Sequence, residues 1–276
     1  MIDILLKFTQ KAGRKLKSMR KNVKTMGNKD SSVSSLVTQA DVYISDIFAK
    51  TVKKHFSHLS YMIIDEEKIT NYGKDIFNKI KSTEYQFVID PIDGTIQYAN
   101  NHPLYGITIG VYKNAKPLMG LIYLPEIEEM IYFDGKKAYY VQNCFKKNEI
   151  KTELLPQAKA DTSIIFGHPW LWDLTSEFST DKALFLDYFA SVSQCFYSLL
   201  SKAKGYCMWL YLWDIAGTLP IAEYLGIKLY KYGSNKACNG ISPDFFDSDM
   251  GLKDLCVMCH SKDYKEICSM VCPKKQ

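Results

Sequence analysis

Two aspartates three residues apart, Asp90 and Asp93, are the strongest indication of chemistry in the sequence. They lie in segment 85–95 (YQFVIDPIDGT), which begins with an apolar and aromatic run typical of a short buried strand. Pro91 fixes its own φ and lacks an N–H, and Gly94 permits a backbone conformation that other residues resist. We therefore predict a rigid turn that directs both carboxylates to one place, although a plain turn also fits these residues. Hard cations such as Mg²⁺ bind carboxylate and carbonyl oxygens, and phosphate binds backbone N–H groups.

Two other segments place acids where they could join this turn. The apolar run 61–64 is followed by Asp65, Glu66 and Glu67, and Asp214 follows Trp213 at the start of a predicted helix. A solvated turn and a helix cap are the ordinary interpretations of these acids. Two strands that both end in acids favour a shared site at neighbouring strand ends.

The composition predicts a globular protein with a large core. The chain has 276 residues, of which 47% are hydrophobic and 13% aromatic, enough for one large domain or two closely joined ones. Much of the net charge of +5 comes from an amphipathic helix predicted near residues 1–25. Its basic face favours a solvated surface over a membrane or nucleic-acid contact. We find no signal peptide or transmembrane segment, and expect a soluble cytoplasmic protein.

The eight cysteines have no compact framework and predict unpaired thiols in a reducing compartment. A zinc site formed by the last four was considered. Cys256 and Cys259 lie in an apolar run typical of a strand, and Cys268 and Cys272 are spaced i, i+4 on a predicted helix. Buried thiols are therefore the favoured interpretation.

The remaining pattern predicts an antiparallel meander followed by alternating strands and helices. A second helix follows the segment 36–41, and a mobile loop or hairpin is expected over 27–35. A polar stretch, 146–161, is a candidate domain seam. The meander strands are expected at 106–112, 118–124, 129–133 and 138–142. Later strands are expected at 164–166, 227–230 and 255–258, with helical segments at 181–202, 213–225 and 262–271.

Five motifs in a fixed order resemble those of the inositol monophosphatase superfamily, lithium-sensitive and Mg²⁺-dependent phosphatases. The first signature is DPIDGT, and the second is the Trp-Asp-x-Ala-Gly segment. These motifs are the segment 36–41 (LVTQAD), the pair Glu66-Glu67, the first signature at 90–95, the glycine-containing strand 106–110 and the second signature at 213–217 (WDIAG).

The resemblance implies an α+β fold, a layered αβαβα sandwich of the inositol monophosphatase and fructose-1,6-bisphosphatase type. An N-terminal half, 1–145, would carry most metal ligands, and a C-terminal half, 146–276, would carry the second signature and the substrate-facing segment. The two halves would form one catalytic unit, usually within a homodimer. The activity implied is hydrolysis of a small phosphate monoester by metal-activated water, with two or three Mg²⁺ ions in each site.

The resemblance also assigns roles to individual residues. Metal ligands would be Glu66, Asp90, the Ile92 carbonyl, Asp93 and Asp214. Catalytic residues would be Thr95 and Asp41, which orient and deprotonate the nucleophile, together with Glu66 and Asp93. Phosphate and substrate would contact Gly94, Thr95, Ser191, Val192 and Asp214. Ser191 and Val192 are included because 190–193 (ASVS) corresponds to the family's glycine-serine-alanine stretch.

The substrate-facing half departs from the family pattern. Relatives that act on inositol phosphates carry an acid shortly before the second signature, which receives polyol hydroxyls. Here 205–213 (GYCMWLYLW) contains no acid, and Trp209 and Tyr211 either fill the core or offer an aromatic surface to a nucleoside base. Asp65 replaces a usual glycine, and Lys29 and Asp30 lie near the position of a family lysine on the loop.

The favoured function is therefore an inositol-1-monophosphatase-like activity on a small phosphorylated metabolite. The alternatives are 3′(2′),5′-bisphosphate nucleotidase activity, fructose-1,6-bisphosphatase activity, or a non-catalytic member that binds RNA or protein. The basic N-terminal helix alone supports the last alternative, and nucleic acid is not the expected partner.

Overall fold

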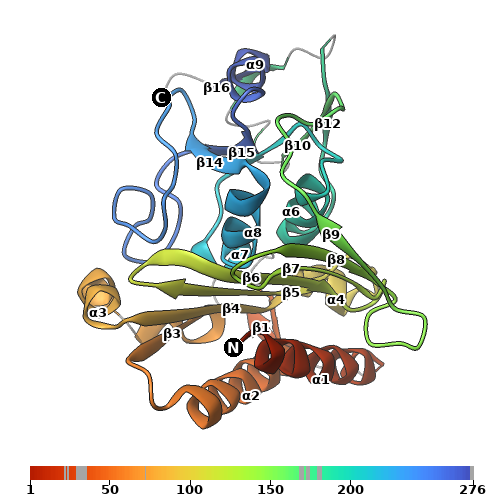
Figure 1. The fold of residues 1–276 in the computed structure, drawn as a ribbon, viewed down its shortest axis with the longest axis vertical. Helices are drawn as coiled ribbons and strands as arrows, with labels where there is room; N and C mark the ends of the chain where they lie inside the picture. The colour runs from red at the N-terminus through yellow and green to blue at the C-terminus, as the bar shows by residue number, and fades with distance from the viewer. Residues whose placement is uncertain are drawn as a thin grey trace.

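Five layers of alternating helices and sheets make up the computed structural model (Figure 1). The structure describes residues 1–21, 23, 25–28, 36–71, 73–167, 171, 175–178 and 182–273. Helices α1 (Ile2–Arg20) and α2 (Gln39–Phe56) cover one face of a seven-stranded sheet. The second helix layer contains α6 (Ser191–Leu199), α7 (Leu212–Ile215) and α8 (Thr218–Leu225). A five-stranded sheet and α9 (Tyr264–Met270) complete the αβαβα order, as predicted.

The seven-stranded sheet contains the predicted meander. Strand β3 pairs in parallel with β4, and the later neighbours are antiparallel. Its order is β3 (Tyr61–Asp65), β4 (Tyr85–Asp93), β5 (Gly106–Lys113), β6 (Lys116–Leu124), β7 (Glu129–Phe133), β8 (Ala138–Gln142) and β9 (Ile150–Leu154). We did not predict β9, because none of its side chains is buried and no alternation marks it. The sheet thus continues to Leu154, and the division after residue 145 stays a prediction.

The five-stranded sheet differs from the prediction in several places. Its order is β12 (Leu184–Leu186), β10 (Ile164–Gly167), β13 (Gly205–Met208), β15 (Cys256–His260) and β14 (Ile227–Lys231). Residues 184–186 form a strand where helical structure was predicted, and the predicted helix 213–225 is divided between α7 and α8. Cys272 lies in β16 (Val271–Pro273), not on a helix, because α9 ends at Met270.

The smaller elements lie around these layers. They are β1 (Thr25–Asn28), β2 (Leu36–Thr38), the 3-10 helices η2 (Glu66–Asn71) and η3 (Gly73–Asp75), α3 (Ile76–Ser82), α4 (Thr95–Ala99) and β11 (Thr175–Phe178). Strands β1 and β2 pair antiparallel, whereas Lys29 and Asp30 lie outside the described residues.

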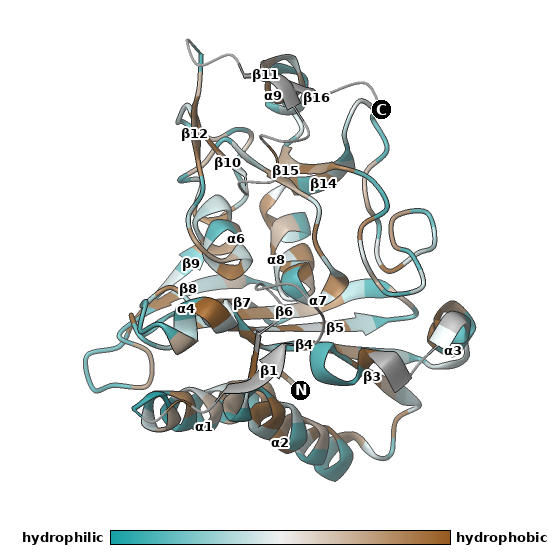
Figure 2. Ribbon diagram, turned by 180° about the vertical axis from the view of Figure 1, so that it is seen from behind, coloured by the Kyte–Doolittle hydropathy of each residue, from teal (hydrophilic) through white to brown (hydrophobic). Residues whose placement is uncertain are grey.

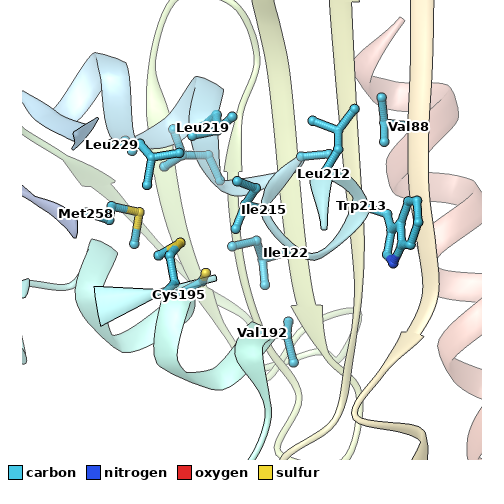
Figure 3. Close-up of a cluster of buried hydrophobic side chains, with 14 of the residues drawn as sticks. Val88, Ile122, Val192, Cys195, Leu212, Trp213, Ile215, Leu219, Leu229 and Met258 are labelled. Atoms are coloured by element: carbon cyan, nitrogen blue, oxygen red, sulfur yellow. The ribbon is translucent and has the colours of Figure 1, made fainter. Parts of the chain in front are cut away.

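Three apolar clusters fill the spaces between layers. The first lies between α1, α2 and the large sheet and includes Phe8, Phe48 and Phe87. It accounts for the apolar face of α1. The predicted basic residues 11, 14 and 15 are exposed, whereas Arg20 is buried. The ribbon of α1 carries both hydrophilic and hydrophobic colours in Figure 2. The second surrounds the middle helices, and part of it is drawn in Figure 3. The third lies under α9 and includes Ile267. Among the described helices, none is long and apolar enough to cross a membrane.

Candidate active site

Three aspartates from the two signatures converge in the structure. Carboxylate oxygens of Asp90, Asp93 and Asp214 all lie within 4.8 Å of one another. Asp90 and Asp93 are 2% and 3% exposed, respectively. Within the described part of the chain, this is the one set of three or more acidic, histidine or cysteine side chains close enough to share a metal ion. Cys256 and Cys259 are buried, unpaired thiols, as predicted, whereas Cys268 is half-buried.

A bulge in β4, rather than a turn, brings Asp90 and Asp93 together. We predicted a strand that stops at Asp90. The strand instead continues and pairs with β5 through Asp93, with an irregular register between the two aspartates. Pro91 lies inside this irregularity, where its missing N–H removes no ladder hydrogen bond. The chain turns at Gly94, whose φ of +87° belongs to the left-handed region that favours glycine.

Asp93 connects the first signature to the middle helix layer. One carboxylate oxygen, Oδ1, accepts a hydrogen bond of 3.2 Å from Ser191 Oγ, and the Val192 N–H also donates to this carboxylate. The other oxygen, Oδ2, is buried without a hydrogen-bond partner. A buried carboxylate oxygen is costly to leave unsatisfied, so a cation beside Oδ2 fits this site.

Two acids at the end of β3 differ in their surroundings, because Asp65 is buried and Glu66 faces the aspartate cluster. Asp65 is fully buried, and its carboxylate accepts hydrogen bonds from Ser45 Oγ (2.6 Å) and the Glu67 N–H (3.0 Å). Glu66 is half-buried and forms a side-chain hydrogen bond with Asp90. Parallel pairing of β3 with β4 places these strand ends side by side, as the sequence predicted.

Thr95 and Asp41 are in direct contact. The Thr95 hydroxyl lies 3.0 Å from both Asp41 Oδ1 and the Ile92 carbonyl oxygen. The other oxygen of Asp41 accepts hydrogen bonds from the backbone and side chain of Thr38, forming a capping box at the start of α2. Asp41 is therefore fixed by its own helix while it faces the first signature.

Two glycines of the large sheet, which have no Cβ atom, leave room for the backbone of the second signature, which carries Asp214. A Cβ atom at Gly110 would lie 2.3 Å from the Ala216 carbonyl oxygen, and one at Gly120 would lie 2.1 Å from that of Gly217. The Gly217 N–H also donates to Thr108 Oγ1 at 3.0 Å. This close approach breaks the predicted helix and places Asp214 above the end of β4.

Burial and mutual repulsion raise the pKa values of the acids. Burial raises the pKa of Asp90 well above its usual range, and the negative charges of Glu66, Asp93 and Asp214 raise it further. Burial raises the pKa of Asp93 to about 7, opposed by the hydrogen bonds from Val192 and Ser191. Carboxylates that resist ionisation together are suited to binding a divalent cation, which replaces their protons.

Burial also raises the pKa of Asp41 to about 6, although its hydrogen bonds with Thr38 oppose the shift. A carboxylate with this pKa can accept a proton near neutral pH and release it again. Asp41 is therefore suited to acid–base chemistry.

The structure thus brings together most of the residues singled out from the sequence. Asp90, Asp93 and Asp214 form the cluster, Glu66 borders it, and Ser191 and Val192 bind Asp93. Ile92 is buried with its carbonyl bonded to Thr95, and Gly94 precedes α4. The roles assigned to these residues stay predictions.

The interpretation of Trp209 and Tyr211 as core residues is wrong. Their side chains are large, yet Trp209 is 43% and Tyr211 is 49% exposed. The Tyr211 N–H donates to Asp214 Oδ2 at 2.8 Å, so Tyr211 is attached directly to the acid cluster.

Sequence reasoning missed two supporting residues, Ser45 and Arg20. Ser45 satisfies buried Asp65. Arg20 is 9% exposed, and its guanidinium binds Glu126 at 2.9 Å and the backbone carbonyls of Gln97 and His102 that follow the first signature. The basic run of α1 gave no indication of which cation is buried, because the contacts come from residues far away in sequence.

Known proteins of one family are similar to this chain in sequence. The profile of the Inositol monophosphatase family matches residues 1–240. A fructose-1,6-bisphosphatase/inositol-1-monophosphatase of Aquifex aeolicus is 23% identical over 176 residues, covering 64% of this chain and 57% of that protein. Inositol monophosphatase 1 of Rattus norvegicus is 24% identical over 241 residues, covering 83% and 82%. The chain spans about half the length of several other curated relatives that it matches.

Solved structures share the fold at low sequence identity. The Thermotoga maritima IMPase superimposes with a TM-score of 0.71 at 17% identity, covering 98% of this chain and 95% of that one. An IMPase/NADP phosphatase solved with Mg²⁺ and phosphate gives a TM-score of 0.72 at 16% identity, covering 99% and 97%.

Proposed function

The chain belongs to the inositol monophosphatase family, and we propose that it hydrolyses a small phosphate monoester with Mg²⁺ as its cofactor. The observation that carries the proposal is the set of three aspartates whose carboxylate oxygens lie within 4.8 Å, two of them buried. Such a cluster is unfavourable without a cation. Its oxygen donors suit Mg²⁺, which prefers carboxylates and keeps several waters.

The ligands we propose come from three segments. Glu66, Asp90 and the Ile92 carbonyl would hold one ion, and Asp90, Asp93 and Asp214 a second, with two or three ions in each site. When bound, Mg²⁺ would lower the pKa of a water molecule and stabilise charge on the ester oxygens. The buried Asp93 Oδ2, which has no hydrogen-bond partner, supports this assignment.

Thr95 and Asp41 would orient the nucleophilic water and remove its proton. The Thr95 hydroxyl has one proton, and donating it to Asp41 leaves its lone pairs to accept a hydrogen bond from water. A proton lost by that water can then pass through Thr95 to Asp41, whose pKa near 6 suits an acceptor at neutral pH.

The backbone at Gly94 and Thr95 would receive phosphate. Gly94 adopts the left-handed conformation directly before α4, and a Cβ atom there would lie 2.8 Å from Ala190 Cβ. The backbone therefore approaches the site closely, and N–H groups at a helix start favour anions.

Phosphate release tests this proposal. Inositol 1-phosphate, glycerol 2-phosphate, fructose 1,6-bisphosphate and adenosine 3′,5′-bisphosphate would be compared with Mg²⁺, with EDTA and with added Li⁺. We expect turnover of at least one ester, its loss in EDTA and in Asp214→Asn, and normal turnover in the exposed-acid control Asp161→Asn. Turnover that survives EDTA, or that Asp214→Asn leaves intact, would refute the proposal.

A further inference from the structure

We propose that Arg20, the last residue of α1, is a positioning residue that holds α4 in place and so fixes the Thr95 hydroxyl at the reacting centre. This role rests on the proposed phosphatase function, in which Thr95 orients the water, and adds a residue far from both signatures in sequence. It is carried by the hydrogen bonds between the buried guanidinium and the residues that follow the first signature.

Helix α4 depends on contacts from outside itself, because it has only five residues. Isolated helices of this length are not stable in water, and the carbonyl groups at a helix end need donors from outside the helix. The start of α4 is held through Thr95, whose hydroxyl lies 3.0 Å from both Asp41 Oδ1 and the Ile92 carbonyl oxygen. The carboxyl end is held by Arg20.

Arg20 donates hydrogen bonds to three carbonyl groups at this end of α4. Its Nε donates to the Tyr98 carbonyl at 3.2 Å, and its Nη2 donates to the carbonyls of Gln97, at 3.5 Å, and His102. These carbonyls lie in the last turn of α4 or shortly after it. A positive charge at the carboxyl end of a helix also interacts favourably with the helix dipole.

The guanidinium itself is fixed on its other sides. Its Nη1 donates to Glu126 Oε2 at 2.9 Å, and the Tyr105 hydroxyl donates to the same carboxylate oxygen at 3.2 Å. The central carbon of the guanidinium lies 4.8 Å from the centroid of the Tyr105 ring, a cation–π arrangement. Each of the three guanidinium nitrogens therefore has an acceptor, and the side chain is only 9% exposed.

Tyr98 connects α4 to α1 in the opposite direction. Its carbonyl accepts the hydrogen bond from Arg20, and its hydroxyl donates to the Leu16 carbonyl of α1 at 3.0 Å. The Tyr98 ring is fully buried and meets the Tyr105 ring edge-on, with 5.0 Å between centroids. The position of α4 is therefore set by α1 through two side chains, Arg20 and Tyr98.

A shift of α4 would move the Thr95 hydroxyl. Thr95 is the first residue of α4, and the Tyr98 N–H closes the first turn on the Gly94 carbonyl at 2.8 Å. Asp41 lies on α2 and Ile92 on β4, so these two partners of Thr95 would not follow the shift. A displacement of about 1 Å in a group that orients a reactant can lower the rate about 100-fold.

The acids of the proposed metal site lie on other elements. Asp90 and Asp93 belong to β4, and Asp214 belongs to α7. Loss of Arg20 should therefore lower kcat while the affinity for Mg²⁺ stays near that of the wild type. This combination separates positioning of Thr95 from general support of the fold, which would affect both quantities.

The test compares Arg20→Met with Lys17→Met in the full-length protein with Mg²⁺, on the ester that the wild type hydrolyses fastest. Lys17 is the matched control, because it lies on the same helix and pairs at 2.8 Å with Glu128, two residues after the acid that Arg20 binds. We expect kcat to fall about 10- to 100-fold in Arg20→Met and to stay near the wild-type value in Lys17→Met.

Arg20→Lys keeps the positive charge but loses the planar fork of donors, so its kcat should lie between those of Arg20→Met and the wild type. It serves as the test variant if Arg20→Met does not fold.

A double-mutant cycle with Thr95→Val identifies the group through which Arg20 acts. Because Thr95→Val already lacks the hydroxyl, replacing Arg20 should lower kcat far less in this background than in the wild type. An equal loss in both backgrounds would overturn the proposal. So would an unchanged kcat in folded Arg20→Met, or a loss of the same size in Lys17→Met.

Should the wild type hydrolyse no ester, the proposed function fails separately, and amide hydrogen exchange then decides on Arg20. The Tyr98 and Asn100 N–H groups donate within α4 to the carbonyls of Gly94 and Ile96. Faster exchange of these two amides in Arg20→Met or Arg20→Lys than in the wild type and Lys17→Met would support the hold on α4. Equal exchange in all variants would refute it.

Discussion

Replacing Asp93 with asparagine should make the metal-free protein more stable at pH 8 and remove most of its stabilisation by Mg²⁺. The asparagine Oδ1 can still accept the hydrogen bonds that Ser191 and Val192 donate. Its amide would replace Oδ2, the buried oxygen without a partner, and would offer hydrogen-bond donors to the neighbouring acids.

The magnitude follows from the pKa of Asp93. Burial raises it from 3.8 to about 7, and each pKa unit corresponds to about 1.36 kcal/mol. Ionised Asp93 thus destabilises the metal-free fold by roughly 4 kcal/mol at pH 8. We expect about 2–4 kcal/mol, because the groups titrate together.

The stability difference between Asp93→Asn and the wild type depends on pH. The folded state binds its proton more tightly than the unfolded state, so the wild type loses stability as pH rises from about 4 to about 7. The advantage of Asp93→Asn should be small near pH 4 and complete by pH 8.

Thermal unfolding in EDTA at several pH values measures this difference. At about 2–4 °C per kcal/mol, the Tm of Asp93→Asn should exceed that of the wild type by roughly 5–15 °C at pH 8. Adding Mg²⁺ should raise the Tm of the wild type and change that of the variant little. A variant less stable than wild type in EDTA, or one that retains the full Mg²⁺ response, would refute the reasoning.

Three further predictions concern turnover, packing and pH. Thr95→Val should lower kcat by about 10²- to 10⁴-fold while Mg²⁺ still raises the Tm, and unchanged kcat would exclude its role in proton transfer. Gly120→Ala should cost about 1–3 kcal/mol in urea unfolding and weaken Mg²⁺ binding, because the added methyl group meets the Gly217 carbonyl; wild-type stability would contradict this contact. The apparent Kd for Mg²⁺, measured by calorimetry, should fall between pH 6 and 8 as the pKa of Asp93, about 7, is passed, and a pH-independent Kd would contradict this shift.

Local patterns that carry chemistry could be predicted from the sequence. The aspartates of the cluster have proline or glycine nearby, residues that restrict or extend the backbone conformations allowed. The order of the motifs that contain them resembles that of one family. The five-layer arrangement followed from that resemblance. The strand bulge at Pro91 could not be distinguished from a turn, because pairing with β5 decides between them.

Other features depend on partners distant in sequence. Strand β9 presents an exposed, polar sequence and exists because β8 offers it an edge. Buried Asp65 accepts a hydrogen bond from Ser45, and Arg20 donates hydrogen bonds to backbone carbonyls that follow the first signature. The sequence of 205–213 also could not show that Tyr211 is exposed, because aromatic residues occur both in cores and at binding surfaces.

Crystals soaked in Mn²⁺, a divalent cation with visible anomalous scattering, provide the most direct test of the central claim. An anomalous difference map should show at least one peak coordinated by the carboxylates of Asp90, Asp93 and Asp214, and no such peak in crystals of Asp93→Asn. An empty cluster at saturating Mn²⁺, or peaks confined to other acids, would contradict the account of these aspartates as a metal centre.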